Sequence, residues 1–240
     1  MKKLEFFKEY TEVSAGFYIA PHDNPDCRAE LLTAQEAKGK SLVWPRQCHS
    51  DKVACIRKKD VHPGLIEIPG TDAVITDVSG VLLTSSHADC LPIYVYDPKN
   101  QVIGLAHSGW RGCLSGIGIN MLTAMEREYG SDPENVITYI GPGIGFCCFE
   151  VDEDVMEMFA GRYPWAEDEF IAAKMIKGND GLTKRKFHID LKELVSEYLS
   201  MEGIRNIKLD PHCTCCGGDD FWSFRRNQTG KRHLAYMELL

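Results

Sequence analysis

Short apolar runs separated by turn-forming residues dominate the middle of the chain. Runs of about four to eight apolar residues between Gly, Pro, Asp or Asn are typical of strands. They predict strands at residues 73–76, 81–85, 93–96 and 102–106, and others at 13–19, 42–49, 52–57, 136–140, 204–209 and 233–240. The connections in the middle block are too short to hold helices, so we expect hairpins that build a mostly antiparallel or mixed sheet.

Apolar residues at helical spacing predict helices between these strands. The expected helices cover residues 27–38, 113–129, 152–159 and 190–198. Gly39 and Gly130 are expected to end the first two, and Asp190 with Glu193 gives the last a start that resembles a capping box. Clustered short strands alternating with helices predict an α+β fold, a single-domain sandwich of mixed β-sheets with flanking helices over residues 1–240.

Composition supports a globular chain with a core of its own. Of the 240 residues, 44% are hydrophobic and 26% charged, so one domain can bury a large core without staples. The net charge is −8, which disfavours a nucleic-acid polymer as a partner. We see neither a secretory signal nor an apolar stretch of about 18 residues, and so expect a cytoplasmic protein without a membrane span. The oligomeric state stays open.

Cysteine is abundant for a chain of this kind. The ten cysteines include the adjacent pair Cys147-Cys148 and the cluster Cys213, Cys215 and Cys216. In a reducing compartment they are expected to be buried thiols, nucleophiles or metal ligands, not disulfides. A second metal site with His212 is one hypothesis, but Cys-x-Cys-Cys lacks the paired Cys-x2-Cys halves of a zinc module. We therefore favour pocket lining by Cys213 and Thr214.

His49, Cys90 and His107 each stand near the end of a predicted strand. Imidazole and thiolate are the usual ligands of zinc, and three protein ligands leave one position open for chemistry. Spacing alone does not separate this hypothesis from hydrogen-bonded structural histidines and a buried thiol. His87 competes as a ligand, and Cys90 as a nucleophile with His107 as its base gives a further alternative, a cysteine hydrolase.

Several sequence blocks occur here in one order. They are Arg46-Gln47-Cys48-His49, Thr71-Asp72-Ala73, Ala88-Asp89-Cys90-Leu91-Pro92, His107-Ser108-Gly109-Trp110-Arg111-Gly112, Gly141-Pro142-Gly143-Ile144-Gly145 and Phe221-Trp222-Ser223-Phe224-Arg225-Arg226. From about residue 13 to the C-terminus the chain resembles the laccase-domain family, also described as multicopper polyphenol oxidoreductases and as purine nucleoside phosphorylases. It departs from the family pattern at Cys48, Ser50, Ser108 and Thr229-Gly230-Lys231, none of which is a proposed ligand.

The resemblance implies a zinc site made by His49, Cys90 and His107. It also implies phosphorolysis of adenosine, inosine and methylthioadenosine, together with adenosine deamination, so that a purine nucleoside and phosphate are the expected partners. A copper-dependent polyphenol oxidase is the alternative. A blue-copper site plus a trinuclear centre uses about ten histidines, whereas this chain has eight and no His-x-His. One copper ion at the trio stays possible, as does a non-catalytic module that binds metal or nucleoside.

Phosphorolysis requires an anion clamp beside the nucleoside. The candidate clamps are Arg46, Arg111, Arg225 and Arg226. We prefer Arg111, because it follows His107 at an expected helix start, where anions are favoured. Gln47 is expected to contact the base or ribose, and Thr214 to bind substrate.

Deamination requires a carboxylate that moves protons. Asp89 is the first candidate and Asp72 the weaker one. Asp89 points away from its neighbour Cys90 if the chain is extended there, which favours a positioning or turn-capping role. Flat faces for a purine, or alternatively core packing, come from Trp110, Phe146, Phe221 and Trp222.

Overall fold

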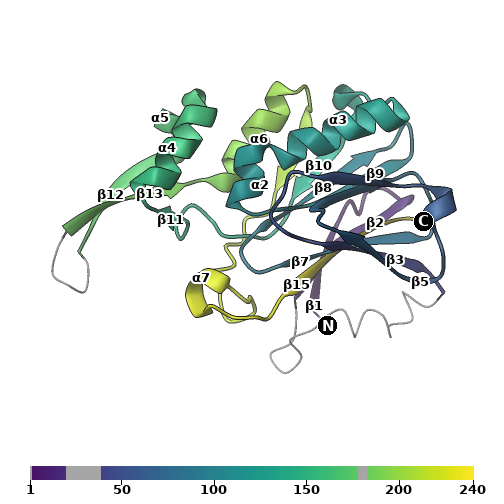
Figure 1. Ribbon diagram of the computed structural model, residues 1–240, viewed down its shortest axis with the longest axis horizontal. Coiled ribbons are helices and arrows are strands. Elements are labelled where there is room, and N and C mark those ends of the chain that lie inside the picture. The colour runs from purple at the N-terminus through teal and green to yellow at the C-terminus, as the bar shows by residue number, and fades with distance from the viewer. Residues whose placement is uncertain (1, 20–38, 178–182) are drawn as a thin grey trace.

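The computed structural model describes residues 2–19, 39–177 and 183–240. Two six-stranded sheets lie face to face, and helices cover the outer face of one of them (Figure 1). The predicted helix at 27–38 lies outside the described residues. The predicted α+β sandwich of mixed sheets is confirmed.

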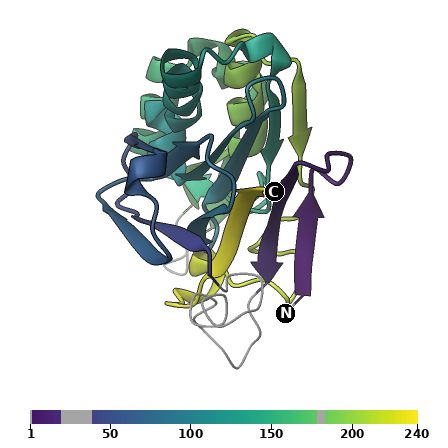
Figure 2. The ribbon, with the colours of Figure 1, turned by 90° about the vertical axis from the view of Figure 1, so that its right-hand side faces the viewer.

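The first sheet contains both the first strand and the last strand of the described chain. Its order is β1 (Lys2–Phe6), β2 (Val13–Ile19), β15 (His233–Leu239), β7 (Val81–His87), β3 (Ser41–Arg46) and β5 (Gly64–Pro69). The β1, β2, β15 and β7 neighbours pair antiparallel, whereas β3 pairs parallel with both β7 and β5. Figure 2 shows β1 and β2, in purple, beside β15, in yellow. Pro45 lies beyond Val43, where the pairing with β7 ends, which explains how a proline fits in this strand.

The second sheet lies between the first sheet and the helices. Its order is β14 (Asn206–Leu209), β10 (Ile137–Ile140), β8 (Leu91–Asp97), β9 (Val102–Ser108), β6 (Ala73–Thr76) and β4 (Val53–Ile56). One face packs Tyr96 and Leu105 against Phe17 and Leu83 of the first sheet. The other face packs Ile93 and its neighbours against the helices. Burial on both faces explains why β8 and β9 are apolar over most of their length, with polar residues only at their C-terminal ends.

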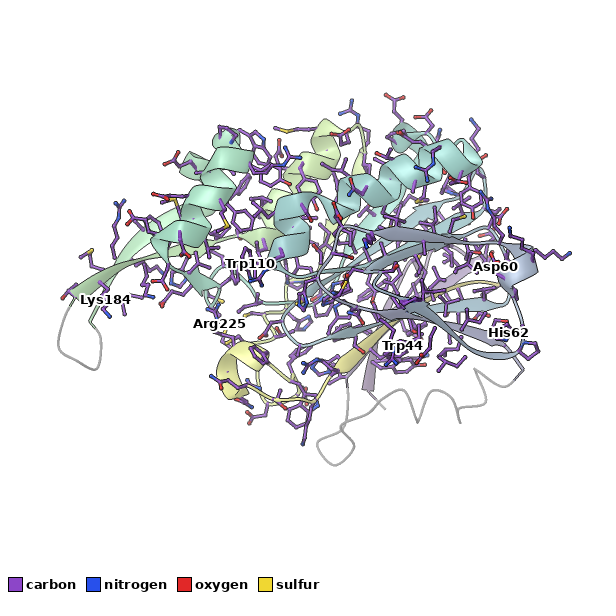
Figure 3. The ribbon with its side chains drawn as sticks, viewed as in Figure 1. Trp44, Asp60, His62, Trp110, Lys184 and Arg225 are labelled. Carbon is purple, nitrogen blue, oxygen red and sulfur yellow. The ribbon has the colours of Figure 1, made fainter. Side chains whose placement is uncertain are left out.

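The helices and a small third sheet complete the described chain. The helices are α2 (Trp110–Ser115), α3 (Ile117–Tyr129), α4 (Glu153–Arg162), α5 (Glu167–Phe170), α6 (Leu191–Met201) and α7 (Phe224–Asn227). The third sheet joins β11 (Glu150–Val151), β13 (Thr183–Ile189) and β12 (Ile171–Lys177). In Figure 3, Lys184 marks the end of this hairpin, far from Trp110 and Arg225. Across the described residues, no helix combines the length and apolar character needed to cross a bilayer.

Two expectations about the middle of the chain need correction. The block of strands does not form one sheet, because β7 pairs with β15 and β3 while β6, β8 and β9 pair in the second sheet. The chain crosses between the sheets at residues 88–90, where Asp89 has a φ of 84°. The helix expected at 113–129 is two helices, because Gly116 (φ 75°) adopts the left-handed conformation and ends α2. The crossing at 88–90 is what brings Cys90 between the sheets.

Candidate active site

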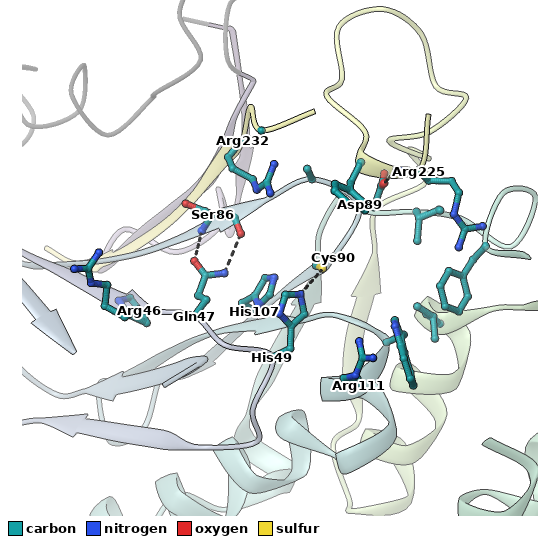
Figure 4. Close-up of a pocket in the computed structure, with 18 of the residues that line it drawn as sticks. Arg46, Gln47, His49, Ser86, Asp89, Cys90, His107, Arg111, Arg225 and Arg232 are labelled. Carbon is teal, nitrogen blue, oxygen red and sulfur yellow. Dashed lines mark hydrogen bonds between the residues drawn. The ribbon is translucent and has the colours of Figure 1, made fainter. Parts of the chain in front are cut away.

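Three side chains from separate elements meet at this crossing. His49 follows β3, Cys90 lies in the corner between β7 and β8, and His107 lies near the end of β9. Their ligand atoms all lie within 4.8 Å of one another, and Cys90 Sγ is 3.8 Å from His49 Nε2. Figure 4 shows both imidazoles beside the Cys90 sulfur. Two imidazoles and one thiol thus form a group that can hold a metal ion, which we call the His49–Cys90–His107 group.

The buried Asp72 carboxylate fixes two members of this group. Asp72 Oδ1 accepts a hydrogen bond from His107 Nδ1 at 2.9 Å and from the His49 backbone N–H at 3.1 Å. Asp72 Oδ2 accepts from the backbone N–H groups of Cys48 and Ser50. Burial opposes ionisation, but these donors hold the pKa of Asp72 well below its usual range. Since Nδ1 of His107 is taken, Nε2 is the nitrogen left for the site. This geometry favours a positioning role for Asp72 over a role in proton transfer.

The charges of Cys90 and His107 depend on each other. Burial alone would raise the pKa of Cys90, but the two neighbouring imidazoles lower it to about 6. Burial alone would lower the pKa of His107, but the Cys90 thiolate and the Asp72 carboxylate raise it to about 9. The sulfur is therefore a thiolate at neutral pH, which is the form that binds metals or attacks substrates.

Strained backbone and a close approach surround the group. His49 has a φ of 61° and Asp89 a φ of 84°, conformations that cost a side-chain-bearing residue about 1–3 kcal/mol each. A Cβ atom on Gly109 would lie 2.7 Å from His49 Cδ2 and 3.1 Å from Cys90 Sγ. Only glycine leaves room at position 109 for both ligands.

His87, the competing ligand, is engaged elsewhere. Its Nδ1 lies 3.0 Å from the carbonyl oxygen of Cys90, and its Nε2 lies 2.7 Å from Ser85 Oγ. The ring is buried, and burial together with the charge on His107 holds the pKa of His87 well below its usual value. His87 supports the corner that carries Cys90 and has no nitrogen left for a metal.

Asp89 is adjacent to Cys90, but its carboxylate faces the C-terminal segment. Oδ1 accepts from Thr214 Oγ1 at 2.7 Å, and Oδ2 accepts from Ser223 Oγ at 3.0 Å and from the Arg225 backbone N–H at 2.7 Å. Three hydrogen-bond donors therefore engage the carboxylate that was the first candidate for proton transfer from sequence alone. This geometry favours the positioning role over the acid–base role.

A pocket of about 720 Å³ opens over the group, which is a usual size for a small-molecule site. Four arginines line it with the three ligands, as Figure 4 shows: Arg46, Arg111, Arg225 and Arg232. Arg232 was missed by the sequence reasoning, although it directly follows the Thr229-Gly230-Lys231 block. Although the chain is acidic overall, this pocket is rich in cationic side chains.

The arginines differ in how they are held. Arg111 stacks on Trp110, with its Cζ 4.1 Å from the ring centroid, and none of the described residues pairs with its guanidinium through a hydrogen bond or ion pair. Arg225 donates from Nη1 to the carbonyl oxygens of Cys148 and Glu150. Arg46 Nε lies 3.4 Å from a carboxylate oxygen of Glu67. The Arg111 guanidinium is thus the one most available to bind an anion.

Two residues expected to bind substrate do not line the pocket. Arg226 donates to the carbonyl oxygens of Cys215, Gly218 and Phe221, so its guanidinium staples its own loop. Thr214 is buried against Asp89. Cys213, also expected at the pocket, belongs to a group of four cysteines, none of which lines the pocket.

Gln47 lines the pocket, but both ends of its amide are engaged. Its Nε2 donates to the Ser86 carbonyl at 2.9 Å, and its Oε1 accepts from the Ser86 N–H at 2.8 Å. The side-chain amide thus pairs with the Ser86 backbone as a neighbouring strand would, and it connects the loop that carries His49 to the end of β7. A direct contact with base or ribose would have to break this pair of bonds.

The apolar wall differs from the expected set of aromatic residues. Trp110 lines the pocket, whereas Phe221 and Trp222 are buried in the core and Phe146 packs on His188. The aromatic residues that line the pocket are Trp44, Trp110, Phe149 and Phe224. Sequence offers no signal that separates these faces from ordinary core residues, because both are apolar.

Comparisons with known proteins identify the family of this chain and several of its relatives. A family model described as multi-copper polyphenol oxidoreductase laccase matches residues 12–239. The purine nucleoside phosphorylase YlmD of Geobacillus stearothermophilus is 32% identical over 248 residues, covering 95% of this chain and 84% of that protein. The adenosine deaminase RL5, from an unknown prokaryotic organism, is 31% identical over 207 residues, covering 84% and 76%. The crystal structure of the Bacillus licheniformis hypothetical protein YfiH superposes with a TM-score of 0.79 at 26% identity, covering 99% and 96%.

Proposed function

This chain belongs to the multi-copper polyphenol oxidoreductase laccase family, and on that premise we propose that it is a zinc-dependent purine nucleoside phosphorylase with adenosine deaminase activity. The proposed substrates are phosphate and the nucleosides adenosine, inosine and methylthioadenosine. One observation carries the proposal: the His49–Cys90–His107 group lies in a pocket lined by four arginines and four aromatic residues.

The donor set of the group fits zinc. Two imidazoles and a thiolate, with ligand atoms within 4.8 Å of one another, would hold the ion as three ligands, a number that leaves a catalytic zinc one further position for a reactant. When bound, zinc would supply Lewis-acid activation of an oxygen nucleophile. Asp72 completes the arrangement by holding the Nδ1 side of His107, as metal-binding imidazoles usually require.

The same donors do not fit a multicopper oxidase. Such an enzyme uses about ten histidines, whereas the chain has eight and His87 is engaged by Ser85 and Cys90. A single copper ion could bind the group in vitro, because copper exceeds zinc in affinity for such ligands. This alone gives no oxidase.

In the proposed phosphorolysis, a phosphate oxygen attacks the anomeric carbon and the purine leaves with the electrons of its glycosidic bond. Arg111 would hold the phosphate dianion through its forked N–H donors, and Arg232 and Arg46 line the same pocket. Trp110, Phe149 and the other aromatic side chains offer apolar faces to the purine. These residues would orient the two reactants at one point.

Phosphorolysis is favoured over deamination as the main reaction. Among the described residues that line the pocket, Asp89 is the sole carboxylate, and its oxygens already accept three hydrogen bonds. Deamination requires a carboxylate that exchanges protons with water and substrate, whereas phosphate brings its own nucleophilic oxygen. We therefore propose deamination as the slower activity.

A cysteine hydrolase is the second candidate. The pKa of Cys90 is lowered to about 6, and Asp72 orients His107 as in a nucleophile–base–carboxylate series. That series needs one imidazole, yet here His49 also lies against the sulfur, at 3.8 Å. The second imidazole favours metal binding.

The test measures inosine turnover by zinc-loaded protein with and without phosphate. We expect hypoxanthine and ribose 1-phosphate only when phosphate is present, and slower conversion of adenosine to inosine without it. Cys90→Ala is the control for contaminating phosphorylase. Turnover equal to that of Cys90→Ala contradicts the proposal, and retained activity in zinc-free protein, blocked by a thiol alkylating reagent, supports the hydrolase.

A further inference from the structure

Four cysteines from two distant loops meet outside the pocket. Cys147 and Cys148 end the glycine-rich loop that follows β10, and Cys213 and Cys216 lie in the loop that follows β14. Their sulfur atoms all lie within 4.8 Å of one another, and Cys147 Sγ is 3.4 Å from Cys216 Sγ. Cys215 is not a member, so Cys213 and Cys216 form a Cys-x2-Cys pair that the sequence reasoning overlooked.

We propose that these four thiols bind one zinc ion in a closed structural site, separate from the proposed active site. A tetrahedral zinc with Zn–S bonds of about 2.3 Å places its sulfur ligands about 3.8 Å apart, which suits the observed spacing. Four protein ligands leave no position for substrate. The Gly145 backbone N–H lies 3.2 Å from Cys213 Sγ, a donor of the kind that stabilises a coordinated thiolate.

Cationic side chains surround the two loops. Lys192 Nζ donates to the carbonyl oxygens of Asp210 and His212, each at 2.7 Å. Arg226 donates to those of Cys215 and Gly218, and Arg225 donates to that of Cys148. Zinc with four thiolates carries a net charge of −2, and three cations bound to these loops offset it. They also hold the loops in place around the sulfurs.

A disulfide explains the arrangement less well. Joining Cys147 to Cys216 would use two of the four sulfurs and leave Cys148 and Cys213 at the same point without a role. A zinc ion uses all four.

The site would brace one wall of the pocket. The glycine-rich loop supplies Ile144 and Phe149 to the pocket lining. The second loop supplies Thr214, which binds Asp89 next to Cys90, and the two loops already meet at the bridge between Gly143 and Cys213. An ion shared by both loops would fix that wall, and structural zinc commonly contributes to folding in this way.

The test counts metal in the full chain, purified under reducing conditions. We expect two zinc ions per chain in the wild type and one in Cys147→Ser/Cys216→Ser. Cys215→Ser, in the same loop but outside the cluster, is the matched control and should keep two. His49→Ala/His107→Ala should keep one zinc, so failure of the proposed active site is distinguished from failure of this one.

Cobalt binding gives a second, spectroscopic measurement of the same site. Added to metal-free His49→Ala/His107→Ala, Co²⁺ should produce the intense sulfur-to-cobalt charge-transfer bands of a tetrathiolate, and these should weaken in the same protein carrying Cys216→Ser. The proposal is overturned if the bands do not form, if metal content does not depend on Cys147 and Cys216, if the cluster holds iron with inorganic sulfide, or if freshly isolated protein contains a Cys147–Cys216 disulfide.

Discussion

Among the residues that the structure describes, two groups of side chains could hold a metal ion, and they are built differently. The His49–Cys90–His107 group offers three ligands, mixes nitrogen and sulfur, and faces a pocket of about 720 Å³. The four-cysteine group offers sulfur alone and enough ligands to close a tetrahedral site. The first is suited to chemistry and the second to holding loops together.

The residues that support the two groups also reflect this difference between chemistry and structure. In the first group a buried carboxylate, Asp72, binds both His107 and the His49 loop, which fixes the tautomer and the ring. In the second group the neighbouring contacts are backbone groups held by Lys192, Arg225 and Arg226. A site that performs chemistry needs ligands with a fixed orientation. A structural site needs the negative charge of its thiolates offset and its loops held in place.

The largest expected effect separates activity from stability. Cys90→Ala should lower kcat/KM for inosine by at least about a thousandfold, or about 4 kcal/mol of transition-state stabilisation, because it removes a ligand from the chemical site. Its melting temperature in the presence of zinc should stay close to that of the wild type. Cys216→Ser should do the reverse, lowering the melting temperature by several degrees while zinc-saturated protein keeps most of its kcat.

Steady-state kinetics and thermal unfolding of both variants test this contrast. If Cys216→Ser abolished turnover while its melting temperature was unchanged, the division of roles between the groups would be wrong.

The contrast also indicates how far sequence reasoning reaches. The strands at 13–19 and 73–76 were predicted to the residue, because burial leaves a direct apolar signature. Apolar runs do not reveal which sheet a strand joins, so the departure of β7 from the middle block was missed. The hairpin of β12 and β13 was missed as well, since lysines interrupt both strands and only the last three residues of β13 are buried.

The same limits apply to the sites. Motif blocks placed His49, Cys90 and His107 correctly as neighbours, but they could not give the direction of a side chain. Arg226 belongs to a motif block and Thr214 binds Asp89 of another block, yet neither residue lines the pocket. The four-cysteine group joins residues 69 apart in sequence, and the pairing of β10 with β14, together with the bridge between Gly143 and Cys213, brings their loops together.

The second expected effect concerns the orientation of the His107 imidazole. Asp72→Asn should weaken activating zinc about 10–100-fold, because it removes the carboxylate charge beside this imidazole and replaces one of the two accepting oxygens with an N–H donor. In metal-free wild type the pKa of His107 is about 9, so zinc must displace its proton at neutral pH. The zinc concentration for half-maximal activity should therefore fall as pH rises toward 9 and then level off.

The direction of this pH dependence follows from the raised pKa of His107. Its protonated form stabilises the metal-free fold fully below the ordinary value of 6.5, and that stabilisation is lost as pH rises through about 9. In Asp72→Asn the levelling should occur at lower pH, because the carboxylate no longer supports the imidazolium. An identical zinc–pH profile in both proteins would remove Asp72 from this role.

The third effect divides the arginines between the two groups. Arg111→Ala should raise the KM for phosphate about 10–100-fold, the loss expected for charge-assisted hydrogen bonds worth about 1.5–3 kcal/mol. Arg226→Ala is its counterpart beside the cysteine loop, and it should lower the melting temperature while leaving the phosphate KM within about twofold. Phosphate-saturation kinetics of both variants give the comparison, and equal rises in KM would place both guanidinium groups at the substrate.

The smallest effect tests the contact that links the groups. Thr214 follows Cys213 of the four-cysteine group, and its hydroxyl donates to Asp89, which precedes Cys90 of the His49–Cys90–His107 group. Thr214→Val leaves one oxygen of a buried carboxylate without this donor, which should cost about 1–3 kcal/mol of unfolding free energy. Ser223 and Arg225 still bind the other oxygen, so Asp89 should stay in place and the nucleoside KM should change less than about threefold. Thr214→Ser, which keeps the hydroxyl, should match the wild type in denaturant unfolding. A large rise in the nucleoside KM at unchanged stability would instead return Thr214 to the substrate, as the sequence had suggested.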